Sequence, residues 1–332
     1  MGVDTEDSSE TGEVRFSIRR LLPVRDALFS HPAHQASHSS NPWHRESTSW
    51  SSSTSTGEPT DTTSTTTAVP ADLLSGRSPP ARRSLVDQDT DRYLFEVLDP
   101  SLRILLAERK RTMQWTDNVA DCLLRLADRG FTQAQITEVF GTLPLHPAMK
   151  RAIEALSRTL EEGEEDGAET ASELLILSNS NTMFIELVLR HHGLWARFDG
   201  AVITNPARWD PENADRLLLR RRVDAQESQH GCTLGCSANM CKAAELIAYL
   251  ERRGPSKPFD RIAYVGDGDN DYCPISRVLK SGDVALVRSR RELARRIEAE
   301  TAKGNALSCR VMLWEGAWEV EQIFLNTLLK AP

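Results

Sequence analysis

The sequence predicts an α/β fold: a three-layer, Rossmann-like parallel sheet with helices on both faces. Two short apolar runs, at 174–177 and 262–265, each end in small polar residues that open a helix, which is typical of a strand–helix unit in a parallel sheet. Apolar residues at 284–287 predict a third buried strand, and those at 202–203 predict a weaker one. In such sheets, functional side chains gather at the carboxyl ends of the strands.

Helical spacing accounts for most of the remaining apolar residues. Val119, Cys122, Leu123 and Leu126 follow the spacing of one helix face, and Gly130 is suited to end that helix. Further helices are predicted near 132–140, 147–160, 184–189, 246–250 and 320–328. Helices therefore alternate with the predicted strands, as the crossovers of a parallel sheet require.

The first quarter of the chain differs from the rest in composition. Between residues 47 and 67, Ser or Thr occupies 16 of 21 positions, which leaves too little apolar surface to offset the entropy lost on folding. We therefore predict a disordered Ser/Thr-rich tail at 1–83 and a folded domain at 84–332. Apolar residues at 14–29 are the one exception in the tail, although Pro23 interrupts any helix there.

Charge and composition exclude several classes of protein. The formal net charge of −8 and the pI of about 5.6 leave no basic surplus to neutralise a phosphate backbone. No apolar run approaches the ~18 residues of a membrane span. The acidic start of the chain lacks an apolar secretory segment, and six cysteines are few for 332 residues. We expect a cytoplasmic protein with no nucleic-acid or membrane partner.

A run of acidic residues and glycines follows the apolar residues at 262–265. Asp267, Asp269 and Asp271 stand within six positions, and carboxylates that crowd in this way repel one another unless a cation is present. Hard oxygen ligands at a strand end suit Mg²⁺. The alternative interpretation is an Asx-rich turn, which requires only these residue types.

Three further residues are candidates for binding phosphate. Ser178 and Asn179 follow the apolar run at 174–177, where a hydroxyl can bind an anion together with the N–H groups of a helix start. Lys242 begins a predicted helix, where its charge opposes the helix dipole, and an anionic partner would explain this placement. The alternatives are a helix N-cap for Ser178 and a solvated surface side chain for Lys242.

Four possible zinc ligands lie within twelve residues of one another: His230, Cys232, Cys236 and Cys241. Their spacing lacks the paired C-x₂-C rhythm that is usual in structural zinc sites. The alternative is a cysteine-containing loop that is partly buried and binds no metal.

These motifs occur together in the order of one family. Leu-Ser-Asn-Ser-Asn-Thr at 177–182, Cys-Ser-Ala-Asn-Met-Cys-Lys at 236–242 and Tyr-Val-Gly-Asp-Gly-Asp-Asn-Asp-Tyr-Cys-Pro at 264–274 resemble the haloacid dehalogenase superfamily, and more closely its phosphoethanolamine/phosphocholine phosphatase branch. Asn-Pro-Ala at 205–207 and Gly-Asp-Val-Ala at 282–285 resemble it too. The resemblance covers about 84–329.

The resemblance implies a Mg²⁺-dependent phosphatase that acts through an aspartyl-phosphate. Ser178 and Asn179 would then hold the phosphate, Asn179 standing where the branch usually has Asp. Lys242 would neutralise the phosphate, Asp267 would ligate Mg²⁺, and Asp271 would ligate it or orient its water. A helical cap at about 92–146 would select a small phosphorylated metabolite, with phosphocholine, phosphoethanolamine, pyridoxal phosphate and pyrophosphate as candidates.

The sequence departs from this family at the start of the domain. The family opens with a buried strand ending in D-x-D-x-[ST], whose first Asp is the nucleophile; here Ser84 to Asp91 resembles only the tail of that motif. Residues 77–83 include Pro79 and Pro80, which exclude a central strand. The string from Asp87 to Thr90 is an alternative D-x-D-T, but it shifts the rest of the match. The first strand and its nucleophile are therefore predicted to be missing.

Three interpretations of the whole chain remain open. The one we favour is an incomplete translation of an active phosphatase, inactive and poorly soluble as printed, with the strand encoded just upstream of the Ser84 codon. A phosphate-binding pseudoenzyme without turnover is the second. The third is a zinc-stabilised interaction module built on His230 and the cysteines. The extra residue Gly235, between Cys232 and Cys236, is a further departure from the family.

Overall fold

The computed structural model describes residues 16–20 (as backbone), 85–86, 88–158, 172–198, 201–254 and 259–329. The strands are β1 (Phe16–Arg20), β2 (Leu175–Asn181), β3 (Val202–Asn205), β4 (Ala207–Trp209), β5 (Leu217–Leu219), β6 (Arg261–Gly266), β7 (Val284–Arg288) and β8 (Arg310–Trp314). The helices are α1 (Thr90–Leu98), α2 (Pro100–Arg109), α3 (Trp115–Asp128), α4 (Gln133–Thr142), α5 (Pro147–Arg158), α6 (Thr182–His191), α7 (Lys242–Arg253), α8 (Tyr272–Arg277), α9 (Glu292–Ala302) and α10 (Ala317–Ile323). Short helical turns are η2 (Trp195–Phe198), η3 (Asp269–Asp271) and the π-helical η4 (Phe324–Leu328).

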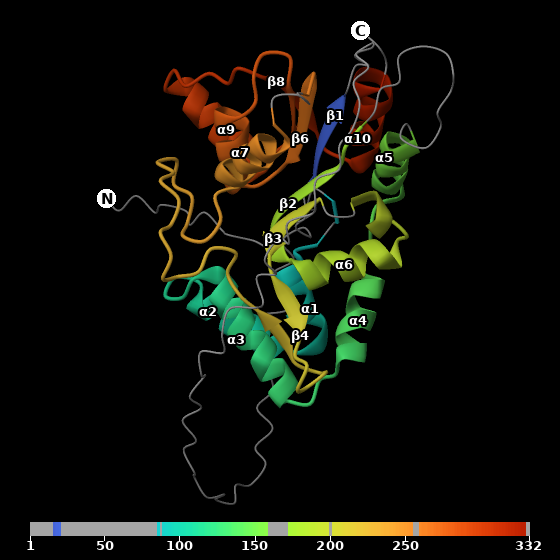
Figure 1. The fold of residues 1–332 in the computed structure, drawn as a ribbon, viewed down its shortest axis with the longest axis vertical. Helices are drawn as coiled ribbons and strands as arrows, with labels where there is room; N and C mark the ends of the chain where they lie inside the picture. Colours follow the sequence, from blue (N-terminus) through green and yellow to red (C-terminus); the bar gives the residue numbers. More distant parts are fainter. Residues whose placement is uncertain are drawn as a thin grey trace, which may run out of the picture. The chain divides into compact units, whose positions relative to one another are not determined.

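The main sheet has six strands in the order β3-β2-β1-β6-β7-β8. Strands β2 and β3 pair in parallel, as do β6, β7 and β8. Strand β1 lies between β2 and β6 and is antiparallel to both (Figure 1). Strands β2 and β6 therefore run in the same direction, and their carboxyl ends meet the same edge of the sheet.

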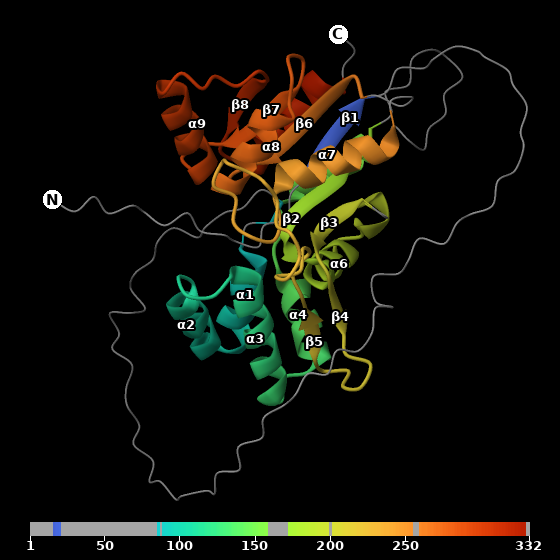
Figure 2. The same ribbon diagram turned by 60° about the vertical axis from the view of Figure 1, so that its left-hand side comes forward.

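Helices cover both faces of this sheet. On one face Leu175, Leu177 and Tyr264 pack in a core shared with α7, α8 and α9, and Figure 2 shows α7 running across the strands. On the other face Ile176 and Val265 belong to a core shared with α5, α6 and α10. This alternation of side chains between two apolar layers explains why the strands are continuous apolar runs in the sequence.

Helices α1 to α4 gather into a separate layer beside the carboxyl edge of the sheet (Figure 2). The predicted helix face of Val119, Cys122, Leu123 and Leu126 is buried in α3, and Gly130 closes that helix with a φ of +85°. The β4–β5 hairpin packs on α3. Among the described residues, no helix combines the length and the apolar character needed to cross a bilayer.

The predicted strands at 174–177, 202–203, 262–265 and 284–287 are confirmed as β2, β3, β6 and β7. The structure differs from the predicted disordered tail at 1–83, because residues 16–20 form strand β1. In the sequence, Val14, Phe16 and Ile18 alternate with polar residues, and this period of two favours a strand over a helix. The strand expected to be missing is thus replaced in the sheet by β1. The rest of the tail, 1–15 and 21–83, lies outside the described residues.

Candidate active site

The carboxyl end of β2 carries Ser178, whose side chain is fully buried. Its hydroxyl oxygen accepts a hydrogen bond from the N–H of Ser180 at 3.1 Å. The hydroxyl of Ser180 in turn lies 2.9 Å from that of Thr90, the first residue of α1. The strand end and the start of the α1–α4 layer are therefore joined beside the candidate phosphate-binding residue.

A buried network of amides holds the same loop. Asn205, at the end of β3, donates through Nδ2 to the carbonyl oxygens of Asn179 at 2.7 Å and of Ser180 at 2.9 Å. Asn239, with a left-handed φ of 111°, donates to Asn205 Oδ1 at 2.8 Å and to Thr116 Oγ1 in α3 at 3.1 Å. Among the described residues, Asn179 Oδ1 is buried and has no hydrogen-bond partner, which leaves an acceptor beside Ser178.

The loop after β6 is organised around the carboxylate of Asp271, which is fully buried. Oδ1 accepts hydrogen bonds from the Tyr264 hydroxyl at 2.8 Å and from Lys242 Nζ at 3.0 Å. Oδ2 accepts from the backbone N–H groups of Asp267 at 3.0 Å and of Gly268 at 3.2 Å. Both oxygens are therefore committed to groups of the protein, and the ammonium of Lys242 is fixed at the edge of the sheet.

The other positions of this loop have distinct environments. A Cβ at Gly266 would lie 2.6 Å from Asp271 Oδ2, so the close approach of that carboxylate requires glycine. Asp267 is fully buried, with Oδ2 3.7 Å from Arg291 Nε, an ion-pair distance rather than a hydrogen bond. Asp269 is half-buried and pairs with Arg296 at 2.6 Å. The three aspartates thus separate into one that holds the loop, one fully buried at the strand end and one that is half-buried and paired with an arginine.

These environments fit the Mg²⁺ ion that the family resemblance implies. Mg²⁺ prefers hard oxygen ligands and retains several waters. Asp267 presents a fully buried carboxylate at the end of β6, and the amide oxygen of Asn179 can accept from a metal-bound water. Because Asp271 already accepts four hydrogen bonds, it is better suited to hold the loop than to ligate the ion directly.

The structure joins Lys242, Asp267 and Asp271 in one network, and it places Ser178 and Asn179 at the same edge of the sheet on β2. Helix α7, which begins at Lys242, packs against β2 as well as α8. Strand β1 lies between the two groups, and its sequence Phe-Ser-Ile-Arg-Arg contains no carboxylate. The five predicted site residues therefore surround a central strand that brings no attacking group.

The residues that follow Ser84 approach the site through α1. Asp89 is its N-cap and accepts from the N–H of Arg92 at 3.2 Å. Asp91 is buried and accepts from the indole N–H of Trp115 at 2.7 Å. Asp87, the other member of the D-x-D-T string, lies outside the described residues. Asp89 and Asp91 therefore serve the start of the helical layer.

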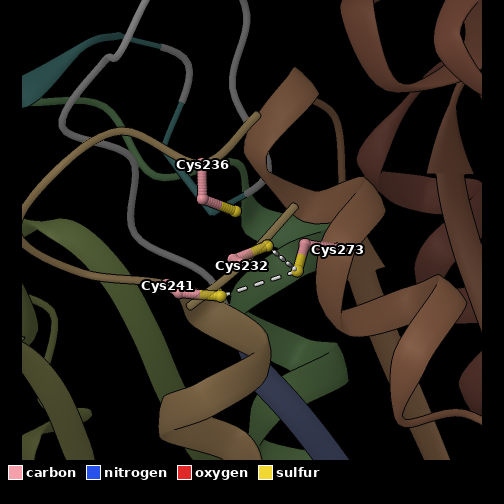
Figure 3. Close-up of side chains that lie close together, drawn as sticks. All are labelled: Cys232, Cys236, Cys241 and Cys273. Carbon is pink, nitrogen blue, oxygen red and sulfur yellow. Dashed lines mark hydrogen bonds between the residues drawn. The ribbon is translucent and has the colours of Figure 1, made fainter. Parts of the chain in front are cut away.

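Four cysteines converge beside Lys242, and they are not the predicted set. The Sγ atoms of Cys232, Cys236, Cys241 and Cys273 all lie within 4.8 Å of one another (Figure 3). His230 is outside the group: its Nε2 lies 2.7 Å from the carbonyl oxygen of Ser237. The prediction of His230 as a fourth ligand was therefore wrong. Cys273 takes that position because η3 and α8 return to the start of α7, a contact that sequence spacing does not show.

The cysteine thiols have very different acidities. Hydrogen bonds from the thiols of Cys236 and Cys273 hold the pKa of Cys241 well below its usual range. Burial raises the pKa of Cys122 and of Cys309, which lie outside the cluster, to about 11. The first environment favours a thiolate, whereas the second keeps the thiol protonated and inert.

The family model described as Putative Phosphatase matches residues 82–328. The chain belongs to this phosphatase family. The phosphatase is 32% identical over 211 residues to the human "Phosphoethanolamine/phosphocholine phosphatase", an alignment that covers 62% of this chain and 70% of the relative. It is 31% identical over 209 residues to "Inorganic pyrophosphatase 2" of Arabidopsis thaliana, with 62% and 67% covered.

A third relative aligns over more of its own length. The phosphatase is 26% identical over 239 residues to the rat "Pyridoxal phosphate phosphatase", an alignment that covers 71% of this chain and 91% of the relative. No solved structure matches the chain. The family resemblance seen in the sequence motifs is confirmed by these comparisons.

Three residues of the site were not predicted as functional from the sequence. Tyr264 was assigned only to a strand, yet its hydroxyl holds Asp271; its place two residues before Gly266, on the face toward α7, was the available signal. Asn205 and Asn239 belong to motifs that the resemblance quotes, but their mutual hydrogen bond spans 34 residues and leaves no trace in spacing.

Proposed function

We propose that residues 84–332 form a Mg²⁺-dependent phosphatase domain for small phosphomonoesters. The observation that carries this proposal is the fully buried ion pair between Lys242 and Asp271 at the carboxyl edge of the sheet, beside the buried Asp267. Burying an ammonium and two carboxylates costs several kcal/mol per ion, and such groupings are typical of active sites. In a chain of this phosphatase family, their natural ligand is a phosphate with its metal.

Each residue then has a defined task. The Ser178 hydroxyl and the Lys242 ammonium would bind phosphoryl oxygens, with Asn179 beside them. Asp267 would ligate Mg²⁺, and Asp271 would hold the loop and orient a metal-bound water. A bound Mg²⁺ would neutralise negative charge on the phosphate. Tyr264 keeps the Asp271 carboxylate oriented toward Lys242 through its 2.8 Å hydrogen bond.

Hydrolysis through an aspartyl-phosphate also requires an attacking carboxylate. Its oxygen forms a bond to phosphorus as the bond to the substrate oxygen breaks, and the departing alcohol takes up a proton. Water then cleaves the acyl phosphate, which releases phosphate and restores the carboxylate. The position for this group lies at the central strand, where β1 brings none. We therefore propose that full activity requires a strand ending in Asp-x-Asp-x directly before Ser84.

The substrate is proposed from the architecture and the relatives. The Rossmann-like sheet would hold the phosphate, and α1–α4 with the β4–β5 hairpin would act as a cap over the leaving group. The network from Thr116 through Asn239 to Asn205 supports this division, because it ties α3 to the phosphate loop. The names of the relatives make phosphocholine, phosphoethanolamine, pyridoxal phosphate and pyrophosphate the candidate substrates.

The test is phosphate release from these four compounds by the full chain, with Mg²⁺ and with EDTA. Calorimetry with inorganic phosphate and Mg²⁺ is run in parallel. We expect phosphate binding that depends on Mg²⁺ and Lys242, and no phosphate release above the EDTA background, because β1 supplies no attacking carboxylate. Absence of Mg²⁺-dependent phosphate binding would overturn the proposal. Binding that persists in Lys242→Ala would refute the site assignment.

A further inference from the structure

The cysteine cluster is built from three separate segments. Cys232 and Cys236 lie in the loop that precedes α7, Cys241 is the N-cap of α7, and Cys273 is in α8. Cys273 Sγ lies 3.4 Å from Cys232 Sγ and 3.5 Å from Cys241 Sγ (Figure 3). The four sulfur atoms point toward a common centre.

The spacing of the sulfur atoms matches that of a tetrahedral metal site. Zinc–sulfur bonds of about 2.3 Å place the sulfur atoms of a tetrahedron ~3.8 Å apart. Two separations in the cluster are 3.4 and 3.5 Å, and all four atoms lie within 4.8 Å of one another. A disulfide would require about 2.05 Å between two sulfur atoms and would leave the other two thiols unexplained. Four soft sulfur ligands without a histidine or carboxylate select zinc or iron.

The surroundings support a closed structural site. Cys241 and Cys273 are buried, and Cys232 and Cys236 are half-buried against the apolar core of the same sheet face. A tetrathiolate zinc centre carries two negative charges. The amino end of the twelve-residue α7 and the guanidinium of Arg277, which interacts with Cys273 and Cys232, supply complementary charge.

The loop is also shaped to bring two of the ligands in. Gly235 has a left-handed φ of +78°, and the direction in which a Cβ would point is open, so it turns the three-residue bridge between Cys232 and Cys236. Arg296 holds this turn by donating to the carbonyl oxygen of Leu234 at 2.5 Å. The extra glycine is therefore accommodated by a turn and does not displace the cysteines from the cluster.

We propose that Cys232, Cys236, Cys241 and Cys273 bind one structural Zn²⁺ ion. Cys241 directly precedes Lys242, and Cys273 lies two residues after Asp271, so the ion would fasten together the two elements that form the buried ion pair. The proposal rests on the sulfur geometry alone and stands or fails independently of the phosphatase function.

The first test is the metal content of the purified full chain, measured by mass spectrometry without any activity assay. We expect about one zinc per chain, and X-ray absorption showing four sulfur ligands at about 2.3 Å. Cys232→Ser should lower bound zinc at least tenfold. Cys309→Ser is the matched control, a buried cysteine of the same domain outside the cluster, and should retain the zinc.

If Cys232→Ser does not fold, the zinc site can be tested on the wild-type chain instead. Titration of the wild-type chain with a mercurial should release one zinc as the cluster thiols react. A metal-free chain with six titratable thiols would overturn the proposal, and so would a chain whose mass shows disulfides within the cluster. Iron in place of zinc, or loss of zinc from Cys309→Ser, would also contradict it.

Discussion

Strands β1 and β6 lie side by side at the centre of the sheet, yet they differ in every property that a catalytic strand needs. β6 is an apolar run, buried from Ile262 to Gly266, and its carboxyl end opens into the loop that holds Asp271. The sequence of β1 alternates and ends in two arginines, a composition typical of an edge strand. It also runs the opposite way, so its amino end faces the site.

The difference separates two requirements that usually coincide in one strand. A sheet needs a partner for the backbone N–H and C=O groups of β2 and β6, and each unmet buried group costs about 1–3 kcal/mol. Any extended segment can meet that need, and β1 does so through residues paired with both neighbours. Catalysis needs a carboxylate at one position of one parallel strand, and only a specific sequence supplies it.

The largest expected effect comes from replacing β1 with a strand that meets both requirements. In this chimera, residues 1–83 are exchanged for an apolar strand ending in Asp-x-Asp-x directly before Ser84. Because loss of a nucleophile typically costs several orders of magnitude, phosphate release should rise on the order of 10⁴-fold. The control chimera ends in Asn-x-Asn-x and should stay at the basal rate. Equal activity of both chimeras would refute the proposal that the attacking carboxylate belongs at the end of the central strand.

The next effect tests the β6 side in the active chimera. Asp267→Asn removes the charge proposed to ligate Mg²⁺ and should raise the Mg²⁺ concentration for half-maximal activity on the order of 100-fold. Asp269→Asn is the matched control in the same loop, since its half-buried carboxylate pairs with Arg296 and not with the groups around Asp271. An unchanged Mg²⁺ dependence in Asp267→Asn would show that the metal lies elsewhere.

Lys242→Ala in the same chimera removes the ammonium that pairs with Asp271 and is proposed to bind the phosphate. Loss of the ammonium removes the ion pair with the buried Asp271 and should weaken the binding of phosphate. We expect kcat to fall about 10²- to 10³-fold, the usual cost of removing one preorganised donor. Lys242→Arg should recover part of the rate if charge is what matters. A change in stability alone, with kcat preserved, would make Lys242 structural.

A smaller effect is expected when the pairing of β1 is disrupted by a substitution in the original 332-residue chain. Ile18→Pro removes one N–H from the ladder opposite Ala263 and should lower the free energy of unfolding by about 3 kcal/mol. Thr54→Pro, in the Ser/Thr tract, is the control and should change nothing. Urea denaturation followed by circular dichroism gives both values. Equal midpoints for the two variants would show that β1 contributes nothing to the sheet.

The smallest effect concerns the helices behind the sheet, far from the comparison of β1 with β6. Arg151 hydrogen-bonds Glu321 at 2.6 and 2.8 Å and holds the pKa of that carboxyl below its usual value of 4.5. Since the folded pKa is depressed, the pair stabilises the fold above pH 4.5, and this contribution is lost as pH falls through the folded value. Arg151→Met should therefore lower the urea midpoint at pH 6, and its difference from the wild type should shrink as the pH falls below 4.5.

The sequence predicted the parts of the fold whose signal is local. Strands β2, β6 and β7 and helix α3 follow from apolar runs and helical spacing, and the site motifs lie at strand ends as expected. Helices α1 and α2 were missed because their short apolar faces are interrupted by charged residues and Pro100. The β4–β5 hairpin and β8 were also missed, since three-residue strands and a half-exposed edge strand have weak patterns.

Long-range contacts explain what was missed in the site. The fourth cysteine ligand is 32 residues from Cys241, and the Tyr264 hydroxyl reaches Asp271 only after η3 turns back. Strand β1 was not predicted because the apolar residues at 14–29 were interpreted as a possible helix, although Val14, Phe16 and Ile18 alternate with polar residues. The sequence motifs identify which residues belong to the site, but only the folded structure shows which of them are in contact.

The amide network at the edge of the sheet has a consequence for the order of folding. Its hydrogen bond from Asn239 to Thr116 closes a loop of 123 residues, and the bond to Asn205 closes one of 34. Loop-closure entropy delays such contacts until local helices and neighbouring strands have formed. We expect this corner to be the last region to acquire protection from hydrogen exchange during refolding, so that a chain with a nearly complete sheet still lacks an ordered phosphate loop.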